Sequence, residues 1–437
     1  MTSDKKVLLT TSFIRDTNDL FDWVGTNIKW KFRFSRPRAI SYALRFIKRN
    51  LPSIEILEYP TWEEFTTKLE EGWDIVGFSF YLNEVHEVIK MIKYTRNKDV
   101  KEIWGGNYGV LTDEVEKYFD KIFHGYAEYD IAEALGKKID TIEHPPLINT
   151  IGFQNFKIYR FGTLFTTRGC SHKCTFCQTP KFNPKPTNIP LENIEKVLQY
   201  YKKVGIKMIG IYDENFGLKS KHSDAVVELL NKYDFFWACM ARADYVAKNV
   251  DKWVNNGGKF IATGVGIESF NSVSLDSANK KVNSEKLINS LKKIQSRGVG
   301  ILGYYIIGFE NETLPAIKAD LKQLAKFNID VTQLTILTPL PKTDLWYEID
   351  EKYGIFEKDF HKFDTKHLVW HHPNIAKDQM EATLDWGLKM VNPRSKPFEM
   401  VYKYLTMMYK NEGIGAFGGL LRSVYYSNKF GIPAVDA

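Results

Sequence analysis

The sequence has few cysteines, only four in 437 residues, and three of them lie within eight residues of one another. Such a set cannot build a disulfide framework, which fits a reducing compartment. The first residues show no signal-peptide pattern, and no apolar run in the chain is long enough to span a bilayer. We therefore expect a cytoplasmic protein whose clustered cysteines serve chemistry.

The chain also lacks a concentrated charge of one sign. Its formal net charge is +7, and its 44% hydrophobic and 26% charged residues are ordinary for a globular protein. Residues 29–38 alternate cations with aromatics, a pattern that can bind nucleic acid. Because no wider basic face accompanies it, we expect no nucleic-acid partner and favour a loop that packs on a sheet or over a cofactor. Reception of an anionic substrate or cofactor phosphate stays open as a hypothesis for this segment.

The length exceeds that of one typical domain and suggests several. Residues 1–140 alternate strand and helix signals, which predicts a doubly wound parallel sheet. Residues 141–160 contain turn residues and are expected to form a linker. Residues 161–345 contain six further strand-and-helix repeats, and residues 346–437 are expected to form a helical capping region. The sequence thus predicts an α/β protein with a second sheet after the first.

Small and polar residues follow the strands of the first predicted sheet. Parallel sheets bind ligands at the carboxyl ends of their strands. The residues at these ends are Ser79, Gly105, Gly106, Asn107, Gly125 and Glu128. The glycines do not fit the dinucleotide pattern G-x-G-x-x-G, and as turn residues they would need no ligand.

Cys170, Cys174 and Cys177 form the pattern C-x3-C-x2-C. Three soft sulfur ligands on a short loop favour zinc or an iron-sulfur cluster. His172 lies inside the loop and is a poor fourth ligand for zinc. A 4Fe-4S cluster with three cysteines would instead keep one iron open to a substrate or cofactor.

The expected strands of the second unit also end in polar residues. Active sites of barrels lie at the carboxyl ends of their strands. The residues in question are Asp213, Glu214, Arg242, Glu268, Ser269 and Gly308. Each alone is equally explained as a helix cap, an ion pair or a turn glycine, but their recurrence at successive strands favours a site. Strand alternation turns Cys239 toward the helices if Arg242 points inward, so we expect Cys239 to be a buried spectator.

The cysteine spacing, with Phe176 just before the third cysteine, resembles the cluster loop of the radical S-adenosylmethionine superfamily. The resemblance implies a partial (β/α)6 barrel, a 4Fe-4S cluster on the three cysteines, and cleavage of S-adenosylmethionine to a 5′-deoxyadenosyl radical. It also implies an external reductant such as flavodoxin or ferredoxin. The residues that it places at S-adenosylmethionine are Phe176, Asp213, Glu214, Arg242, Glu268, Ser269 and Gly308.

The order of strand ends in residues 1–140 is similar to the cobalamin-binding domain found in one branch of that superfamily. The matching features are Gly77-Phe78-Ser79, the pair Gly105-Gly106, and Gly125 followed by Glu128. The resemblance implies that Ser79, Gly105, Gly106, Asn107, Gly125 and Glu128 contact cobalamin. The motif Asp-x-His-x-x-Gly of other cobalamin proteins is missing, so a domain that has lost its cofactor stays an alternative.

The resemblance implies a cobalamin-dependent C-methyltransferase that acts at an unactivated carbon. One alternative is a radical rearrangement, cyclisation or oxidation without methyl transfer. A more distant one is a non-catalytic iron-sulfur protein that binds nucleic acid. The substrate class stays open between a lipid, a tetrapyrrole, a peptide and a small metabolite.

The last part of the sequence adds two candidate features. His367, His371 and His372 lie close together, but no acidic or thiol partners at ligand spacing accompany them, so we expect a cap over the barrel rather than a metal site. One of these histidines, or Tyr304, is a candidate substrate contact. Residues 414–421 are apolar and glycine-rich, suited to cover the site or meet a lipid but too short to span a bilayer.

Overall fold

The structure, a computed structural model, describes residues 5–13, 34–35, 40–153, 156–255 and 258–393, and some positions between 395 and 409. Most of the alternating cationic and aromatic segment at 29–38, and all of the glycine-rich segment at 414–421, lie outside the described residues.

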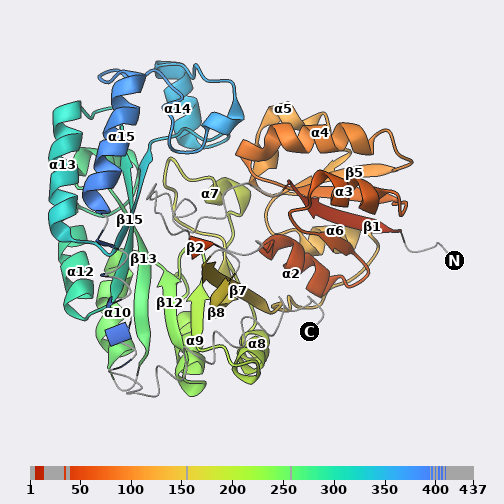
Figure 1. The fold of residues 1–437 in the computed structure, drawn as a ribbon, viewed down its shortest axis with the longest axis horizontal. Helices are drawn as coiled ribbons and strands as arrows, with labels where there is room; N and C mark the ends of the chain where they lie inside the picture. Colours follow the sequence, from red (N-terminus) through yellow and green to blue (C-terminus); the bar gives the residue numbers. More distant parts are fainter. Residues whose placement is uncertain are drawn as a thin grey trace.

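The first unit is a parallel sheet of five strands with the order β3-β1-β4-β5-β6 (Figure 1). Its register pairs Thr11 with Ser79 and Ser79 with Gly106, so the carboxyl ends of the three central strands lie level. The strands are β1 Val7–Thr11, β3 Glu55–Leu57, β4 Ile75–Ser79, β5 Glu102–Gly106 and β6 Lys121–Ile122. This architecture confirms the doubly wound sheet expected from the sequence.

Helices cover both faces of the first sheet because its side chains alternate. Val7 and Leu9 pack in one buried cluster with residues of α2 and α6, whereas Leu8 packs in the other cluster with residues of α3 and α4. The helical elements are α2 Tyr42–Asn50, α3 Trp62–Leu69, η1 Leu82–Glu84, α4 Val85–Thr95, η2 Tyr108–Leu111, α5 Asp113–Glu116 and α6 Glu128–Ala134. Because helices cover both faces of the sheet, the carboxyl ends of its strands are the place where a ligand can bind.

The second unit is a curled sheet of eight strands with the order β15-β14-β13-β12-β11-β8-β7-β2. Six neighbouring strands are parallel and form the expected partial barrel. They are β8 Phe156–Leu164, β11 Met208–Ile211, β12 Phe236–Met240, β13 Phe260–Glu268, β14 Gly300–Ile307 and β15 Val331–Ile336. The chain thus carries two separate sets of parallel strand ends.

The helices of the second unit lie on the outer side of its sheet (Figure 1). The long ones are α8 Leu191–Lys203, α9 Ser220–Lys232, α10 Ala243–Val254, α12 Ser284–Ser296, α13 Leu314–Phe327 and α15 Lys377–Val391. Shorter elements are β9 Thr167–Arg168, α7 Thr179–Phe182, β10 Thr187–Asn188, α11 Ser272–Ser277, α14 Asp344–Lys352 and η3 Phe360–Lys362. None of the described helices is both long and apolar enough to cross a membrane.

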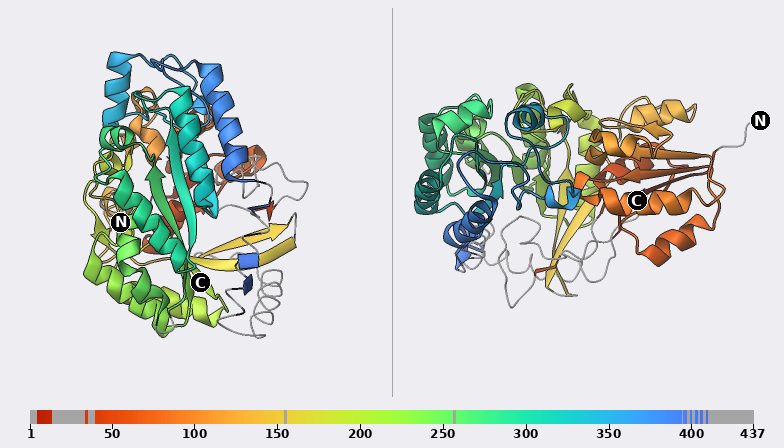
Figure 2. Two further views of the ribbon diagram at one scale, coloured as in Figure 1. Left: turned by 90° about the vertical axis from the view of Figure 1, so that its left-hand side faces the viewer. Right: turned by 90° about the horizontal axis from the view of Figure 1, so that it is seen from above.

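The segment expected to be a linker contains most of a β-hairpin. Strand β7, Leu147–Phe153, pairs antiparallel with β8 and, at its far end, with β2, Phe34–Ser35 (Figure 2). The turn signals of His144, Pro145 and Pro146 come just before β7, and the residues that follow include the β-branched Ile148, Thr150 and Ile151, which favour a strand. The hairpin therefore extends the second sheet rather than only connecting two units.

Tyr201 of α8 fastens this hairpin to the barrel. Its side chain is fully buried, and its hydroxyl accepts a hydrogen bond from Leu147 N at 2.8 Å and donates to Thr163 O at 2.8 Å. The hydroxyl thus satisfies backbone groups of both strands where they begin to diverge.

Replacing Tyr201 with phenylalanine keeps the ring but removes both hydrogen bonds. We expect the free energy of unfolding to fall by about 1–3 kcal/mol, because the buried N–H of Leu147 loses its acceptor. Urea denaturation measures this loss. The matched control is Tyr200→Phe, a half-buried neighbour on the same helix. Equal effects of the two substitutions would contradict the role of the Tyr201 hydroxyl.

Candidate active site

The three clustered cysteines lie in a loop that follows β9. Cys170, Cys174 and Cys177 are all half-buried and free of disulfides. Together with His172 and Phe176 they line one open cavity of about 390 Å³ at the carboxyl ends of the barrel strands. The fold therefore brings the sulfur atoms to the end of the barrel where chemistry is expected.

The loop is held close to the rest of the chain on both sides. Gly169 has a φ of +84°, and a Cβ there would lie 2.7 Å from Asn183 Nδ2 and 2.9 Å from Asn183 O. Thr175 N donates to Ala278 O at 3.2 Å, and Asn279 Nδ2 donates to Lys173 O at 2.7 Å. The entry to the loop consequently requires glycine, and its middle is tied to the turn after α11.

The thiols fit a metal group that they would share. Burial raises the pKa of Cys170 and of Cys174, and the nearby charge of Cys177 raises both pKa values further. The three thiols line the same cavity, and soft metals displace the protons of thiols on binding. Burial also lowers the pKa of His172. Three sulfur donors in the wall of one cavity fit an iron-sulfur cluster held by three protein ligands.

Asp213 lies behind the cysteine loop and does not line the cavity. Its buried carboxylate accepts hydrogen bonds from Thr166 N at 2.6 Å, Thr166 Oγ1 at 2.6 Å and Thr167 N at 3.0 Å. Both of its oxygens are therefore engaged by the segment that leads into the loop. The residue proposed from the sequence as a contact of S-adenosylmethionine thus has a positioning role in this structure.

Glu214, the next residue, points to the opposite side and connects the two units. Its Oε1 accepts a hydrogen bond from Tyr126 Oη at 2.5 Å, and its Oε2 accepts one from Gly169 N at 3.0 Å. Glu214 also lines the cysteine cavity and a second cavity in the first unit. It is the contact point between the two sites.

Two further sequence-predicted residues lie in the wall of the cysteine cavity. Arg242 pairs with Asp244 at 3.1 Å and donates to Lys280 O at 2.8 Å. Glu268, whose φ is +59°, forms a buried ion pair of 2.6 Å with Lys280. Charged groups of both signs therefore face this cavity.

Ser269 and Gly308 do not line the cavity among the described residues. Ser269 is fully buried and its hydroxyl accepts from Asn271 N at 3.0 Å. Gly308 has a φ of +85° and donates its N–H to Glu312 Oε2 at 2.8 Å. The structure gives both residues a role in shaping the strand ends.

The second cavity lies at the carboxyl ends of the first sheet and has a volume of about 250 Å³. All the residues predicted for the first unit line it, namely Ser79, Gly105, Gly106, Asn107, Gly125 and Glu128. Its apolar wall includes Leu9, Phe46, Trp104 and Phe123. A mostly apolar cavity with a few polar groups is the usual form of a cofactor site.

Backbone geometry keeps the rim of the second cavity open. Gly125 has a φ of +75°, and a Cβ there would lie 3.0 Å from Phe182 O. Asn107, with a φ of +72°, donates from Nδ2 to Ser79 Oγ at 3.2 Å. At Gly106 the nearest atom of the described residues to an added Cβ is 3.9 Å away, so these residues leave the space beside this glycine open to a ligand.

Arg168 and Glu128 form a buried ion pair between the units. Their side chains are 4% and 3% exposed, and Arg168 Nη2 lies 2.9 Å from Glu128 Oε1. The guanidinium lies 4.0 Å from the ring centre of Phe46 and 4.5 Å from that of Tyr126. Arg168 Nε is buried and has no hydrogen-bond partner in the described part of the chain. The carboxylate of Glu128 is thus committed to the protein, and Arg168 keeps one donor for a ligand of the second cavity.

Sequence reasoning missed Arg168, Tyr126 and Lys280 as site residues. Arg168 precedes the cysteine loop directly, and Tyr126 lies within the glycine-flanked strand end, so both carried a local signal. The sequence around Lys280 gave no such signal, because its partner Glu268 belongs to a different element.

The C-terminal histidines have separate partners. His367 Nδ1 lies 2.9 Å from Asp364 Oδ1, whereas His372 Nε2 lies 3.0 Å from Phe309 O. His371 is exposed and packs against Phe356. Tyr304, the other candidate substrate contact, does line the cysteine cavity.

The match to known proteins agrees with this geometry. Residues 164–327 match the model of the Radical SAM superfamily, and these residues contain the cysteine loop and the strands that carry the cavity. Residues 164–327 therefore form a radical SAM domain, and the chain is a radical SAM enzyme.

Two curated relatives illustrate what the chain is similar to. An uncharacterized methyltransferase of Pyrococcus horikoshii is 28% identical over 71% of this chain and 77% of its own. The bacteriochlorophyllide d C-8(2)-methyltransferase of Chlorobaculum tepidum is 27% identical over 74% of this chain and 78% of its own.

Two solved structures share the fold. The radical S-adenosylmethionine methyltransferase TsrM of Kitasatospora setae, solved with cobalamin and a [4Fe-4S] cluster, gives a TM-score of 0.63 at 13% identity and covers 98% of this chain and 100% of its own. The cobalamin-dependent S-adenosylmethionine radical enzyme OxsB, solved with aqua-cobalamin and S-adenosylmethionine, gives a TM-score of 0.63 at 15% identity. The match covers 94% of this chain and 72% of the OxsB chain. Both sheets therefore have counterparts in known enzymes.

Replacing Asp213 with asparagine tests the support of the cysteine loop. In either orientation the amide group places its own N–H donors against a backbone N–H of Thr166 or Thr167. We expect iron bound per chain to fall by roughly twofold or more after anaerobic reconstitution, although all three cysteines remain. The matched control is Asp224→Asn on α9, where a carboxylate pairs with Lys252 at the surface. Unchanged iron content in Asp213→Asn would contradict the positioning role.

The same variant has a pH signature in the cluster-free protein. Burial raises the pKa of Asp213 to about 7, against the lowering effect of the Thr166 and Thr167 donors. A carboxyl of the unfolded chain titrates near about 3.9, so between the two values the folded chain binds more protons. The free energy of unfolding should therefore fall as pH rises from about 4 to about 7, and Asp213→Asn should remove this contribution. Parallel pH profiles of the two proteins would exclude it.

Proposed function

We propose that the protein is a cobalamin-dependent radical S-adenosylmethionine methyltransferase that methylates an unactivated carbon. The observation that carries the proposal is the pair of cavities that share Glu214 as a wall, one lined by the three cysteines and the other by the glycine-rich strand ends. A methyltransferase of this kind needs a radical source and a methyl source beside one substrate. The methyltransferase names of the curated relatives support this reading.

The cysteine cavity would hold a 4Fe-4S cluster and S-adenosylmethionine. Bound there, they supply a 5′-deoxyadenosyl radical that removes a hydrogen atom from the substrate. Cys170, Cys174 and Cys177 are the ligands. Arg242 and the Glu268 and Lys280 pair present charges of both signs to the zwitterionic methionyl group, and Phe176 adds an apolar contact.

The second cavity would hold cobalamin, which supplies the methyl group when bound. The open space beside Gly106 lets a broad planar ring approach the strand ends. The free donor of Arg168 Nε suits a carbonyl or phosphate oxygen of the cofactor. The hydrogen-bonded side chains of Ser79 and Asn107 lie in the same wall and are proposed contacts.

The chain's own residues would keep the two cofactors in a fixed relation. Tyr126 and Gly169 both donate to Glu214, so the first sheet and the cysteine loop share one carboxylate. Tyr108 stacks on Phe182 of α7 with ring centres 4.3 Å apart, which covers another side of the junction. These contacts exclude water and bring the methyl source to the place where the substrate radical forms.

For the substrate we favour a largely apolar molecule, with a tetrapyrrole as the leading candidate. Much of the cysteine cavity's wall is apolar, with Met240, Ile306, Leu337 and Leu340 among its residues. The named substrate of one relative is bacteriochlorophyllide d, a tetrapyrrole. A flavodoxin or ferredoxin is the proposed electron donor.

Anaerobic assay of the reconstituted protein tests the proposal. With S-adenosylmethionine, cobalamin, reductant and candidate tetrapyrroles, we expect 5′-deoxyadenosine, S-adenosylhomocysteine and a product heavier by one methylene unit, all detected by mass spectrometry. Cys170→Ala, Cys174→Ala and Cys177→Ala should each abolish 5′-deoxyadenosine, because a cluster ligand is lost. Cys239→Ala is the matched control, since Cys239 is buried and lies away from the cavity.

The assay separates the parts of the proposal. Formation of 5′-deoxyadenosine without S-adenosylhomocysteine or methylated product would support the radical chemistry but contradict the proposed methyl transfer. Activity in the cysteine variants would overturn the radical mechanism itself.

Gly106→Leu tests cobalamin in the first unit. A leucine side chain can enter the free space beside Gly106, so we expect it to fill the second cavity and weaken cobalamin binding by about tenfold or more. Gly106→Ala is the matched control and should bind nearly as well as the native chain. Binding is followed by the visible spectrum of the protein after gel filtration. Retention of cobalamin by Gly106→Leu would place the cofactor elsewhere.

A further inference from the structure

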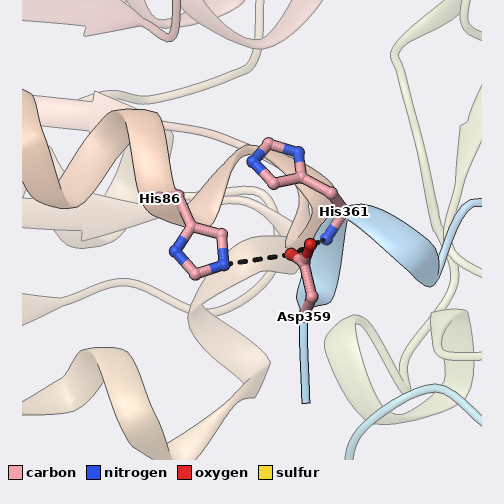
Figure 3. Close-up of side chains that lie close together, drawn as sticks. All are labelled: His86, Asp359 and His361. Carbon is pink, nitrogen blue, oxygen red and sulfur yellow. Dashed lines mark hydrogen bonds and ion pairs between the residues drawn. The ribbon is translucent and has the colours of Figure 1, made fainter. Parts of the chain in front are cut away.

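Three possible metal ligands gather where the first unit meets the C-terminal region. His86 lies in the first turn of α4, whereas Asp359 and His361 lie at the start of η3, far along the chain (Figure 3). The elements η1 and η3 lie side by side, which brings the two segments together. The group is separate from both cavities.

The group has nearly the dimensions of a metal site. One ligand atom from each residue lies within 4.8 Å of the other two. His86 Nε2 is 3.2 Å from Asp359 Oδ1, and the two imidazole rings stack with centres 5.1 Å apart. Ligand atoms bound at about 2.0–2.2 Å to tetrahedral zinc lie roughly 3.3–3.6 Å apart. Small rotations of these half-exposed side chains would close the difference.

Glu87 supplies a second, independent indication. Its Oε1 lies 3.3 Å from His361 Nε2, so its carboxylate is on the same side as the group. Its Oε2 is buried and has no hydrogen-bond partner among the residues that the structure describes. A buried carboxylate oxygen without a donor is costly, and a bound cation would satisfy it.

We propose that His86, Asp359 and His361 form a binding site for a divalent transition metal, with zinc as the best match. Two nitrogen ligands and one carboxylate suit zinc better than magnesium or calcium, which prefer oxygen alone. The metal would join α4 of the first unit to the segment that ends at Thr365, which lines the cysteine cavity. It would thus fasten the cap of the active site to the first unit.

Zinc binding to the full-length chain tests the site. The parent protein for this test carries alanine in place of Cys170, Cys174 and Cys177, because these thiols would otherwise compete for zinc. Titration against a chromophoric chelator should show one tight site per chain, and Co²⁺ in its place should give the visible absorption of a tetrahedral complex. His86→Ala or His361→Ala should each weaken zinc binding by about tenfold or more.

Two variants separate metal binding from other roles. His86→Gln keeps a hydrogen-bond donor for Asp359 but offers no imidazole nitrogen, so it should lose zinc while its melting temperature without metal stays that of the parent. His124→Ala removes an exposed histidine outside the group and should bind zinc normally. The proposal is overturned if the parent binds no stoichiometric zinc, if His86→Gln binds as well as the parent, or if His124→Ala loses binding equally.

Discussion

The buried ion pair between Arg168 and Glu128 is the constraint on which the relation of the two units depends. Removing two charges from water costs several kcal/mol for each, so the arrangement holds only where both partners meet in good geometry. Arg168 lies two residues before Cys170, and Glu128 is the first residue of α6. The pair therefore ties the start of the cysteine loop to the first sheet. A small displacement of one unit against the other would break the pair before water could reach the two charges, which is strongly unfavourable.

Asp213 and Glu214 show how adjacent carboxylates divide two tasks. They follow the same strand, but successive side chains point to opposite sides, so Asp213 supports the loop from behind and Glu214 faces the junction of the cavities. A polar residue at a strand end predicts where a side chain will be. It does not predict whether the side chain faces a ligand or satisfies the backbone, because this choice depends on neighbours brought by other elements.

The same distinction separates what the sequence could predict from what it could not. The cysteine triad and the glycines of the first sheet were predictable, since their meaning lies in short spacings and in strands that end nearby. Lys280 and the partners of Arg168 were not, because these contacts form only when distant elements pack together. The strands within 141–160 were hidden by Pro145 and Pro146, whose turn signal outweighed the β-branched residues after them. His86 and Asp359 meet only through the packing of η1 against η3.

Because Glu214 lines both cavities, binding of a ligand in one cavity is expected to affect binding in the other. A ligand in the second cavity that accepts from Arg168 Nε stabilises the present position of Arg168, and with it the neighbouring Gly169 that Glu214 holds. A ligand at the cysteines needs the same loop conformation. Each ligand then favours the state that the other binds, and linkage requires both to gain affinity by the same factor. Glu214 and the pair of Arg168 and Glu128 contact both the cysteine loop and the first unit, so this coupling would be carried by side chains already in contact.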